Sequence, residues 1–280
     1  MIYDLHSHST FSDGTLSPEA LVERAHEQGV NVLALTDHDD TQGLSAARKK
    51  ADELGLTLIN GVEVSVTWKN NQTIHIVGLN FDPSSETLQN GLIEIREERI
   101  RRAKKIAEKL DKCGIPNVWQ EIVEEVGFEA ITRTHFARYL IDRGHVNEMQ
   151  KAFTKWLGKN GKAFVNGHWA SMEEGVKWIV EAGGLAVIAH PVRYNMTRSK
   201  LEKLVVDFKA CGGQGIEVVA NRYTADEIAQ TASIARRHEL LASVGSDFHC
   251  PGNPYVELGR NLELPTDCKP VWHDWQLQPG

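Results

Sequence analysis

Histidines and acidic residues gather at a few points of this 280-residue chain. His6 and His8 form an H-x-H pair, and alternate residues of an extended segment point to the same side. Two imidazoles presented in this way can bind one metal ion, although a pair of exposed loop histidines has the same pattern. The pair alone therefore leaves both interpretations open.

Residues that can bind metal also stand at most of the other points where a predicted strand ends. They are Asp13 in the loop after the H-x-H pair, His38 and Glu63 after two further strands, His75 in a fourth strand, His190 after a later strand, and Asp247 and His249 after the last strand. In parallel α/β folds the carboxyl ends of the strands meet on one face, where sites are built. Because so many junctions carry these residue types, we expect a metal site rather than unrelated surface histidines.

The elements that must position these residues follow a strand–helix rhythm. Apolar strands are predicted at 2–5, 32–36, 56–62, 73–79, 185–189, 215–219 and 241–244, and amphipathic helices at 18–28, 41–54, 171–182, 198–210 and 224–237. Short apolar strands that alternate with helices indicate a parallel sheet covered by helices, either open or closed into a barrel.

The middle of the chain interrupts this rhythm. Residues 92–112, 119–126, 134–142 and 148–157 have helical patterns, and little between them favours a strand. We therefore expect a barrel formed by residues 1–91 and 162–280, with a helical insertion at 92–161 between two of its strands.

Composition excludes several classes of protein. A net charge of −7 argues against a protein that coats nucleic acid through bulk charge. Four cysteines that lie far apart, with no C-x-x-C pair, argue against a disulfide framework or a cysteine-bound zinc site. The sequence shows no signal peptide and no apolar run long enough to cross a membrane. We expect a cytoplasmic protein.

Together these motifs resemble those of the PHP (polymerase and histidinol phosphatase) superfamily. The resemblance implies a distorted (β/α)7 barrel, here with a helical insertion, whose nine motif residues bind up to three metal ions. It implies one ion on His6, His8, Glu63 and Asp247, a second on Glu63, His75 and His190, and a third on Asp13, His38 and His249.

The chemistry of this ligand set also follows from the residue types. Six imidazoles and three carboxylates suit Mn, Fe or Zn better than Mg, and we expect Mn first, with Fe and Zn as alternatives. Three divalent ions would leave a surplus of about +3, which suits a phosphoryl group. Metal-bound water with a pKa near ~7 would be the nucleophile, so no covalent catalytic residue is required. The general acid is left open.

Arginines provide a hint about the substrate. On the predicted helix 92–112, Arg99 and Arg102 fall within the apolar stripe that faces inward. Arginine on such a face is either a clamp for a second phosphate or a structural residue that reaches water or an internal acid. Arg133 and His135 open a later helix, whose N-terminus favours phosphate, and Arg193 follows His190 closely. For His135 a purely structural role is an equal alternative.

Within the superfamily, the spacing of the motifs is similar to that of bacterial members that hydrolyse nucleoside 3′,5′-bisphosphates and act as 5′→3′ exoribonucleases on short RNA. We therefore expect nucleoside bisphosphates and 5′-phosphorylated short RNA as partners, and neither a duplex nor a membrane. The oligomeric state is not predicted. The alternatives are a small-molecule phosphomonoesterase such as a histidinol-phosphate phosphatase, a non-catalytic scaffold stabilised by metal, and an amidohydrolase, which would normally have a lysine at a strand end.

Overall fold

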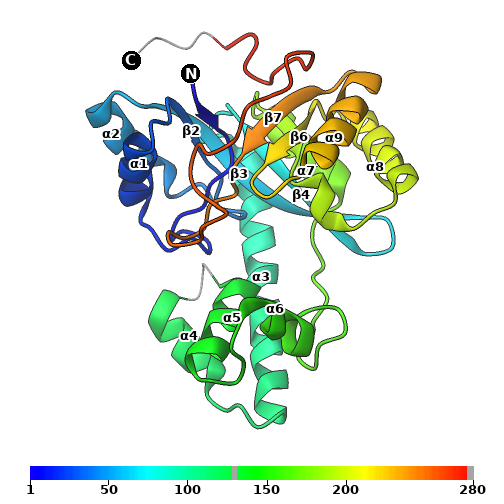
Figure 1. Cartoon of the computed structure of the whole chain (residues 1–280). Coiled ribbons are helices and arrows are strands. Elements are labelled where there is room, and N and C mark those ends of the chain that lie inside the picture. Colours follow the sequence, from blue (N-terminus) through cyan, green and yellow to red (C-terminus); the bar gives the residue numbers. More distant parts are fainter. Residues whose placement is uncertain (128–130, 276–280) are drawn as a thin grey trace. The chain divides into compact units, whose positions relative to one another are not determined.

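The computed structural model describes residues 1–127 and 131–275. The chain divides into two compact units, Met1–Leu92 with Ala170–Gly280, and Ile93–Trp169. We call the first the barrel unit and the second the helical unit (Figure 1). Helix α3 (Glu86–Lys112) is the element within which the chain passes from the first unit to the second.

The barrel unit is built on one sheet, in which the seven strands of the described chain are hydrogen-bonded in sequence order. They are β1 (Tyr3–Asp4), β2 (Val32–Leu35), β3 (Thr57–Trp68), β4 (Gln72–Leu79), β5 (Leu185–Ile188), β6 (Gly215–Ala220) and β7 (Leu241–Gly245). The Leu5 amide donates to the Val244 carbonyl at 3.1 Å, so the two edges of the sheet approach and the barrel nearly closes. Leu5, Ala34, Val77 and Val187 pack inside it with no exposed surface.

The expectation of an all-parallel sheet was wrong for one strand. β4 runs antiparallel to both β3 and β5, whereas the other neighbouring strands are parallel. The chain turns directly from β3 into β4 at Asn70 and Asn71, which have φ angles of 58° and 55°. Asparagine tolerates this left-handed conformation, which two-residue hairpin turns require. Because β3 continues to Trp68, Glu63 lies inside a strand rather than at its end.

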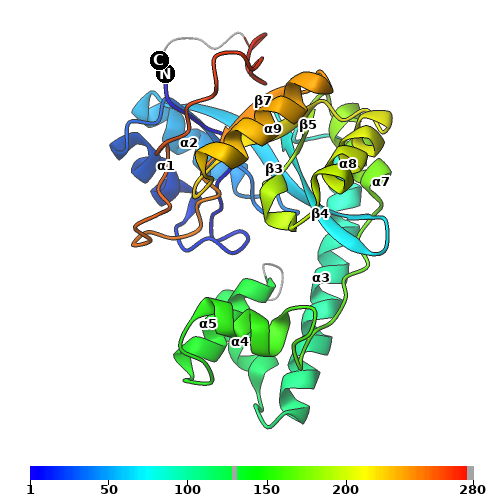
Figure 2. The same cartoon turned by 45° about the vertical axis from the view of Figure 1, so that its right-hand side comes forward.

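Helices cover the outside of this sheet (Figure 2). They are α1 (Pro18–Glu27), α2 (Leu44–Leu54), α7 (Met172–Glu181), α8 (Arg198–Ala210) and α9 (Ala225–Arg237). Ser171 and Thr224 begin α7 and α9 with capping boxes, in which a glutamate three residues later returns the hydrogen bond. Helix α2 begins three residues later than predicted, and Gly43 precedes it without a side-chain cap.

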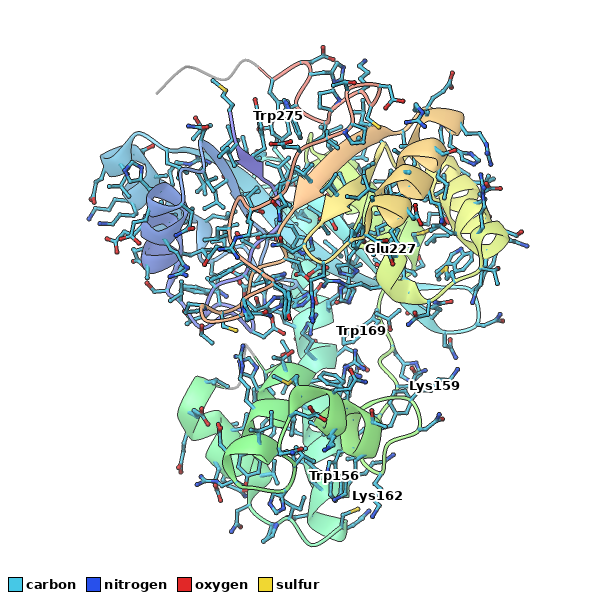
Figure 3. All side chains as sticks on the ribbon, in the orientation of Figure 1. Trp156, Lys159, Lys162, Trp169, Glu227 and Trp275 are labelled. Carbon is cyan, nitrogen blue, oxygen red and sulfur yellow. The ribbon has the colours of Figure 1, made fainter. Side chains whose placement is uncertain are left out.

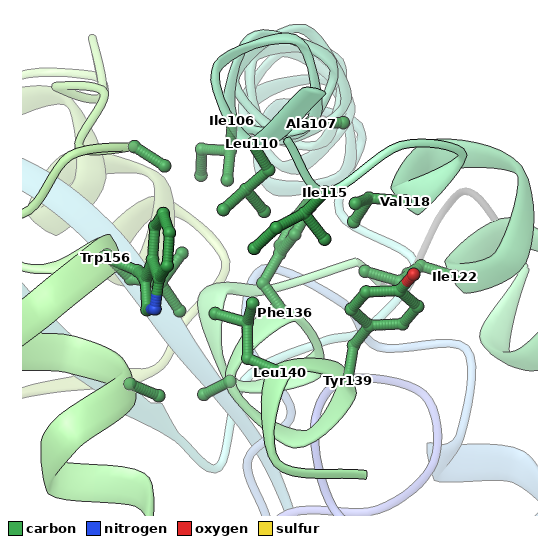
Figure 4. Packing of buried hydrophobic residues seen from close by; sticks show 14 of the residues in the cluster. Ile106, Ala107, Leu110, Ile115, Val118, Ile122, Phe136, Tyr139, Leu140 and Trp156 are labelled. Atoms are coloured by element: carbon green, nitrogen blue, oxygen red, sulfur yellow. The ribbon is translucent and has the colours of Figure 1, made fainter. Parts of the chain in front are cut away.

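The helical unit packs around its own apolar core. Besides α3 it contains α4 (Val118–Val126), α5 (Arg133–Asp142), α6 (Met149–Ala152) and a π-helix at Phe153–Leu157, where one continuous α-helix was expected. Ile106, Leu110, Phe136, Leu140 and Trp156 are buried against one another (Figure 4).

Helix α3 begins six residues earlier than predicted. Gly91 lies inside it because the ring of Trp178 occupies the space that a Cβ would need, at 2.4 Å. Close packing therefore outweighs the poor helix propensity of glycine at this position. Among the described residues, no helix combines the length and the apolar character needed to cross a membrane.

Candidate metal centre

The H-x-H pair lies just after β1, where both imidazoles are completely buried. Their Nε2 atoms are 3.1 Å apart, and each lies 3.3 Å from Oε2 of Glu63. Oδ1 of Asp247 is 3.4 Å from the His6 Nε2 and 3.1 Å from the His8 Nε2. Four potential ligand atoms from β3, from the segment after β1 and from the segment after β7 thus face one point.

A buried carboxylate that the sequence analysis missed orients His6. Oε1 of Glu217 accepts a hydrogen bond from Nδ1 of His6 at 2.6 Å, and its Oε2 accepts one from the His190 backbone amide. Because a carboxylate only accepts, His6 must carry its proton on Nδ1, which turns the Nε2 position toward Glu63 and Asp247. The signal in the sequence was an acidic residue in the otherwise apolar strand β6.

A second group consists of His8, Asp13, His38 and His249, whose ligand atoms lie within 4.8 Å of one another. Oδ1 of Asp13 is 3.1 Å from Nε2 of His249 and 3.8 Å from Nε2 of His38. The other ring nitrogen of His249 lies 2.9 Å from the backbone carbonyl oxygen of Asp247. A proton on that Nδ1 leaves Nε2 to act as a ligand beside Asp13.

Glu63 joins these groups to a third. Its Oε1 lies 2.9 Å from both Nδ1 of His75 and Nε2 of His190, and its Oε2 lies 2.9 Å from Nδ1 of His38. The structure therefore brings together all nine residues whose types suggested metal binding. A buried carboxylate that faces several imidazoles at once has the geometry of a bridging ligand.

The electrostatics of this cluster also fit divalent cations. Burial alone would raise the pKa of Glu63, but His38, His75 and His6 hold it well below its usual range. Burial would lower the pKa of His249, but Asp13 and Asp247 outweigh it and raise the pKa to about 10. Burial and the nearby His249 lower the pKa of His8 to about 3. The buried carboxylates thus favour a cation between the facing side chains, and His8, which stays neutral at pH 7, can act as a metal ligand.

Backbone strain is concentrated at the same place. His190 has a φ of 29° and Asp247 a φ of 52°, in the left-handed region that residues with a side chain rarely adopt. Gly245 lies so close to His6 that an added Cβ would stand 2.3 Å from the His6 Cβ. Such strain persists where the surrounding structure holds a functional geometry in place.

Asp37 is a further buried acid that the sequence analysis did not assign to the site. It accepts hydrogen bonds from the Ser9 amide, the Ser9 hydroxyl and the Ser12 hydroxyl at 2.6–2.8 Å. Burial raises its pKa to about 6 against the lowering effect of these hydrogen bonds. Asp37 lies just after β2, and its hydrogen bonds hold the loop that follows His8 at this end of the strand.

Arg193 also lies in this cluster. Its guanidinium donates a hydrogen bond to Oδ2 of Asp247, and this ion pair raises the pKa of Arg193. Burial would raise the pKa of Asp247, but Arg193 and the nearby imidazoles lower it. Arg193 therefore holds Asp247 in position.

The other predicted substrate residues belong to the helical unit. Arg99 and Arg102 are both 9% exposed, with their guanidinium carbons 5.2 and 5.5 Å from the centre of the Trp169 ring. Both line one small hollow with Arg133. Burial, followed by Arg133 and Arg99, lowers the pKa of Arg102 to about 9. Trp169, which holds these cations through its ring face, was not predicted.

His135 has a clear structural role. Its Nδ1 accepts a hydrogen bond from the Thr132 amide at 3.1 Å, which completes a capping box at the start of α5. Through Nδ1, His135 therefore has a structural role in α5, which the sequence left open as an alternative to binding substrate.

A nearly closed α/β barrel with a buried cluster of histidines and carboxylates defines a class of metal-dependent hydrolases. Within that class, the chain belongs to the PHP domain family, whose model matches residues 4–184. The expected PHP-type barrel is confirmed.

Similar proteins are known over nearly the whole length. The chain is 46% identical over 276 residues to a 3′,5′-nucleoside bisphosphate phosphatase of Chromobacterium violaceum, which covers 98% of this chain and 96% of the relative. It is 47% identical over 270 residues to a 5′-3′ exoribonuclease of Haemophilus influenzae, with 96% and 97% covered. A solved structure described as an amidohydrolase from Chromobacterium violaceum, with bound sulfate and no metal, superposes with a TM-score of 0.94 at 44% identity, covering 100% of this chain and 99% of that one.

Proposed function

We propose that this chain is a metal-dependent phosphoesterase that hydrolyses the 3′-phosphoester of 5′-phosphorylated nucleotides. It would convert adenosine 3′,5′-bisphosphate to AMP and phosphate, and would remove 5′-terminal nucleotides from short RNA. The observation that carries this proposal is the shared, buried Glu63 between facing imidazoles. The names of the two relatives, each similar over nearly its full length, support the same substrate classes.

The proposed ligands are the nine residues named from the sequence, which would hold up to three divalent ions, with Mn expected first. When bound, such ions activate a water molecule and stabilise charge that develops on the phosphoryl oxygens. The role of the protein is to fix the ligands: Glu217 orients the His6 ring, and Arg193 holds Asp247. This assignment requires no covalent nucleophile.

Arg99, Arg102 and Arg133 are assigned to the 5′-phosphate, which does not react. Three neighbouring guanidinium groups, at least one with a lowered pKa, favour a dianion as partner. His135 of the helical unit and Arg193 of the barrel unit complete the proposed set of substrate residues. We thus propose that the barrel unit carries the reaction and that the helical unit holds most of the residues that select the substrate.

One cleavage accounts for both activities. In a bisphosphate the 3′-phosphoester joins the nucleotide to phosphate, and in RNA it joins the first nucleotide to the rest of the chain. Hydrolysis of the bond between the 3′ oxygen and phosphorus would release a 5′-mononucleotide from both substrates. Nucleotides and RNA fragments of this kind are cytoplasmic, so we also propose the cytoplasm as the compartment.

The direct test is turnover of adenosine 3′,5′-bisphosphate with Mn, beside a 5′-phosphorylated short RNA and histidinol phosphate. We expect AMP and phosphate from the first substrate and 5′-mononucleotides from the second. Hydrolysis of histidinol phosphate alone would keep the metal chemistry but contradict the assignment of the arginines.

Arg99→Ala tests the arginines separately. We expect KM for the bisphosphate to rise about 10- to 100-fold, since a hydrogen bond to a charged group is worth about 1.5–3 kcal/mol. KM for p-nitrophenyl phosphate, which has no second phosphate, should not change. Arg101→Ala is the matched control, because Arg101 lies on the same helix with its side chain 64% exposed and pairs with Glu98. Equal effects of Arg99→Ala on both substrates would show a structural arginine.

A further inference from the structure

Charge is distributed unevenly between the two units. Residues 93–169 contain 15 basic and 11 acidic side chains, a net charge of +4, whereas the rest of the chain contains 16 and 27, a net charge of −11. One basic segment of the helical unit is 151–169, which contains four lysines and no acidic residue. These lysines are distinct from the buried arginines assigned above.

The four lysines are exposed on the last part of the helical unit. They are Lys151, Lys155, Lys159 and Lys162. The Nζ atoms of Lys155 and Lys162 lie 5.0 and 5.4 Å from the centre of the Trp156 ring, which is anchored in the core at 5% exposure. Figure 3 shows Trp156, Lys159 and Lys162 in this part of the unit. One buried ring thus contacts two of the positive charges.

An open hollow of about 660 Å³ adjoins these lysines. Lys151 and Lys155 form one side of it, and Ile141 and Val146 contribute apolar surface. Part of the wall belongs to the π-helix Phe153–Leu157, a rare conformation that is often found at functional sites. The surface therefore combines positive charge with a hollow that has apolar walls.

Few of these charges are neutralised by the protein itself. Lys151 pairs with Glu148 at 3.5 Å. Throughout residues 1–127 and 131–275, Lys155, Lys159 and Lys162 form no ion pair with an acidic side chain. The exposed residues between them, Thr154 and Asn160, are polar, which disfavours insertion into a membrane.

We infer that this lysine surface binds the single-stranded RNA chain beyond its first nucleotide. Lysines would contact successive phosphates, and the hollow would accept a base against its apolar wall. The inference rests on the proposed function, because only a substrate longer than a mononucleotide needs such a surface. It separates the two substrates: a bisphosphate lacks the phosphates that the lysines would contact.

The test compares two triple variants that remove the same charge. One is Lys155→Gln, Lys159→Gln and Lys162→Gln, and the matched control is Lys49→Gln, Lys177→Gln and Lys203→Gln on exposed positions of the barrel unit. Binding of a 5′-phosphorylated, fluorescently labelled 12-nucleotide RNA is measured by anisotropy in EDTA. Hydrolysis of adenosine 3′,5′-bisphosphate is measured separately with Mn.

We expect the helical-unit variant to lose RNA affinity and salt dependence, and the control to behave as wild type. With a slope of about −0.7 per phosphate contact, raising salt from 50 to 200 mM should weaken wild-type binding about 20-fold more than binding by this variant. Lys159→Gln alone, which leaves the ring contacts of Trp156 intact, should change the same ratio about 3-fold. Bisphosphate hydrolysis should be equal in all proteins.

Other results would overturn the inference. Equal losses in both triple variants would show a bulk charge effect, and retained RNA binding with lost binding to phosphatidylserine vesicles would show a membrane contact. Because binding is measured without metal, it is independent of turnover. If the wild-type protein binds RNA through these lysines but hydrolyses neither substrate, the proposed function is wrong. The assignment of RNA binding to the lysine surface would still stand.

Discussion

The two units hold their buried charges in opposite ways. In the barrel unit, acids such as Glu63 and Asp247 face imidazoles, and each charge lowers the cost of burying the other. In the helical unit, Arg102 is buried beside two further arginines, and its pKa falls to about 9. The barrel unit thus contains carboxylates and imidazoles that face one another, whereas in the helical unit three guanidinium groups lie around one small hollow.

This difference indicates different tasks. Compensated ligands form a rigid site before anything binds, which suits chemistry common to every substrate. Neighbouring cations favour a particular anion, which suits selection among substrates. Substitutions of the proposed metal ligands should therefore affect all substrates alike, and substitutions of the proposed substrate residues of the helical unit only those substrates with a second phosphate or a longer chain.

The largest effect is expected for the proposed metal ligands. Asp247→Ala, Asp13→Ala or His190→Ala should reduce kcat/KM about 1,000-fold or more on both the bisphosphate and p-nitrophenyl phosphate, since bound metal supplies several kcal/mol of transition-state stabilisation. Circular dichroism checks that the fold is kept, and Asp226→Ala, at an exposed position of α9, is the control. Normal activity in any of the three purified variants would exclude that residue as a ligand.

A smaller loss of kcat/KM, equal for all substrates, is expected for Glu217→Gln. The amide retains the shape but weakens the hydrogen bond that orients His6. Partners of this kind typically contribute about 10- to 100-fold to metal affinity or activity. Activity measured over a range of Mn concentrations should recover at high Mn. A defect confined to 5′-phosphorylated substrates would instead place Glu217 in substrate selection and weaken the contrast between the units.

The sequence predicts the candidate ligands better than the residues that support them. His6, Asp247 and the other proposed ligands could be identified as candidates because metal binding would restrict the residue types and strand ends bring such residues together. Glu217 and Trp169 could not, because their roles depend on contacts between distant segments, as between His6 and Glu217. The direction of β4 was predicted wrongly for the same reason. β4 has the same apolar pattern as the strands that pair in parallel elsewhere in the sheet, and only the Asn70–Asn71 turn indicated its reversal.

The start of α3 shows a second limit of local patterns. Gly91 lowers helix propensity, and the predicted helix began just after it. The ring of Trp178, about ninety residues away in the chain, packs against Gly91 and allows the helix to continue through it. Elements fixed by tertiary contact of this kind are found only when the partner is known.

The smallest effect, and the one of opposite sign, is expected for Arg102→Met. Taken alone, a pKa lowered from 12.5 to about 9 corresponds to roughly 5 kcal/mol of unfavourable free energy. Removing the charge also removes the hydrogen bond from Nε to the Val165 carbonyl and the contact with Trp169. We therefore expect the variant to be more stable than wild type by only about 1–2 kcal/mol at pH 7, measured by urea unfolding.

The pH dependence of this difference provides a sharper test. Because the folded-state pKa of Arg102 lies below its unfolded value, folded wild type binds fewer protons than unfolded wild type once the pH passes about 9. Wild-type stability should therefore rise relative to that of the variant between pH 8 and 10.5, and the gap should narrow. A variant less stable at pH 7 would show that the contacts with Val165 and Trp169 outweigh the repulsion. The contacts of Arg102 would then compensate for the burial of its charge, and the contrast between the two units would not hold.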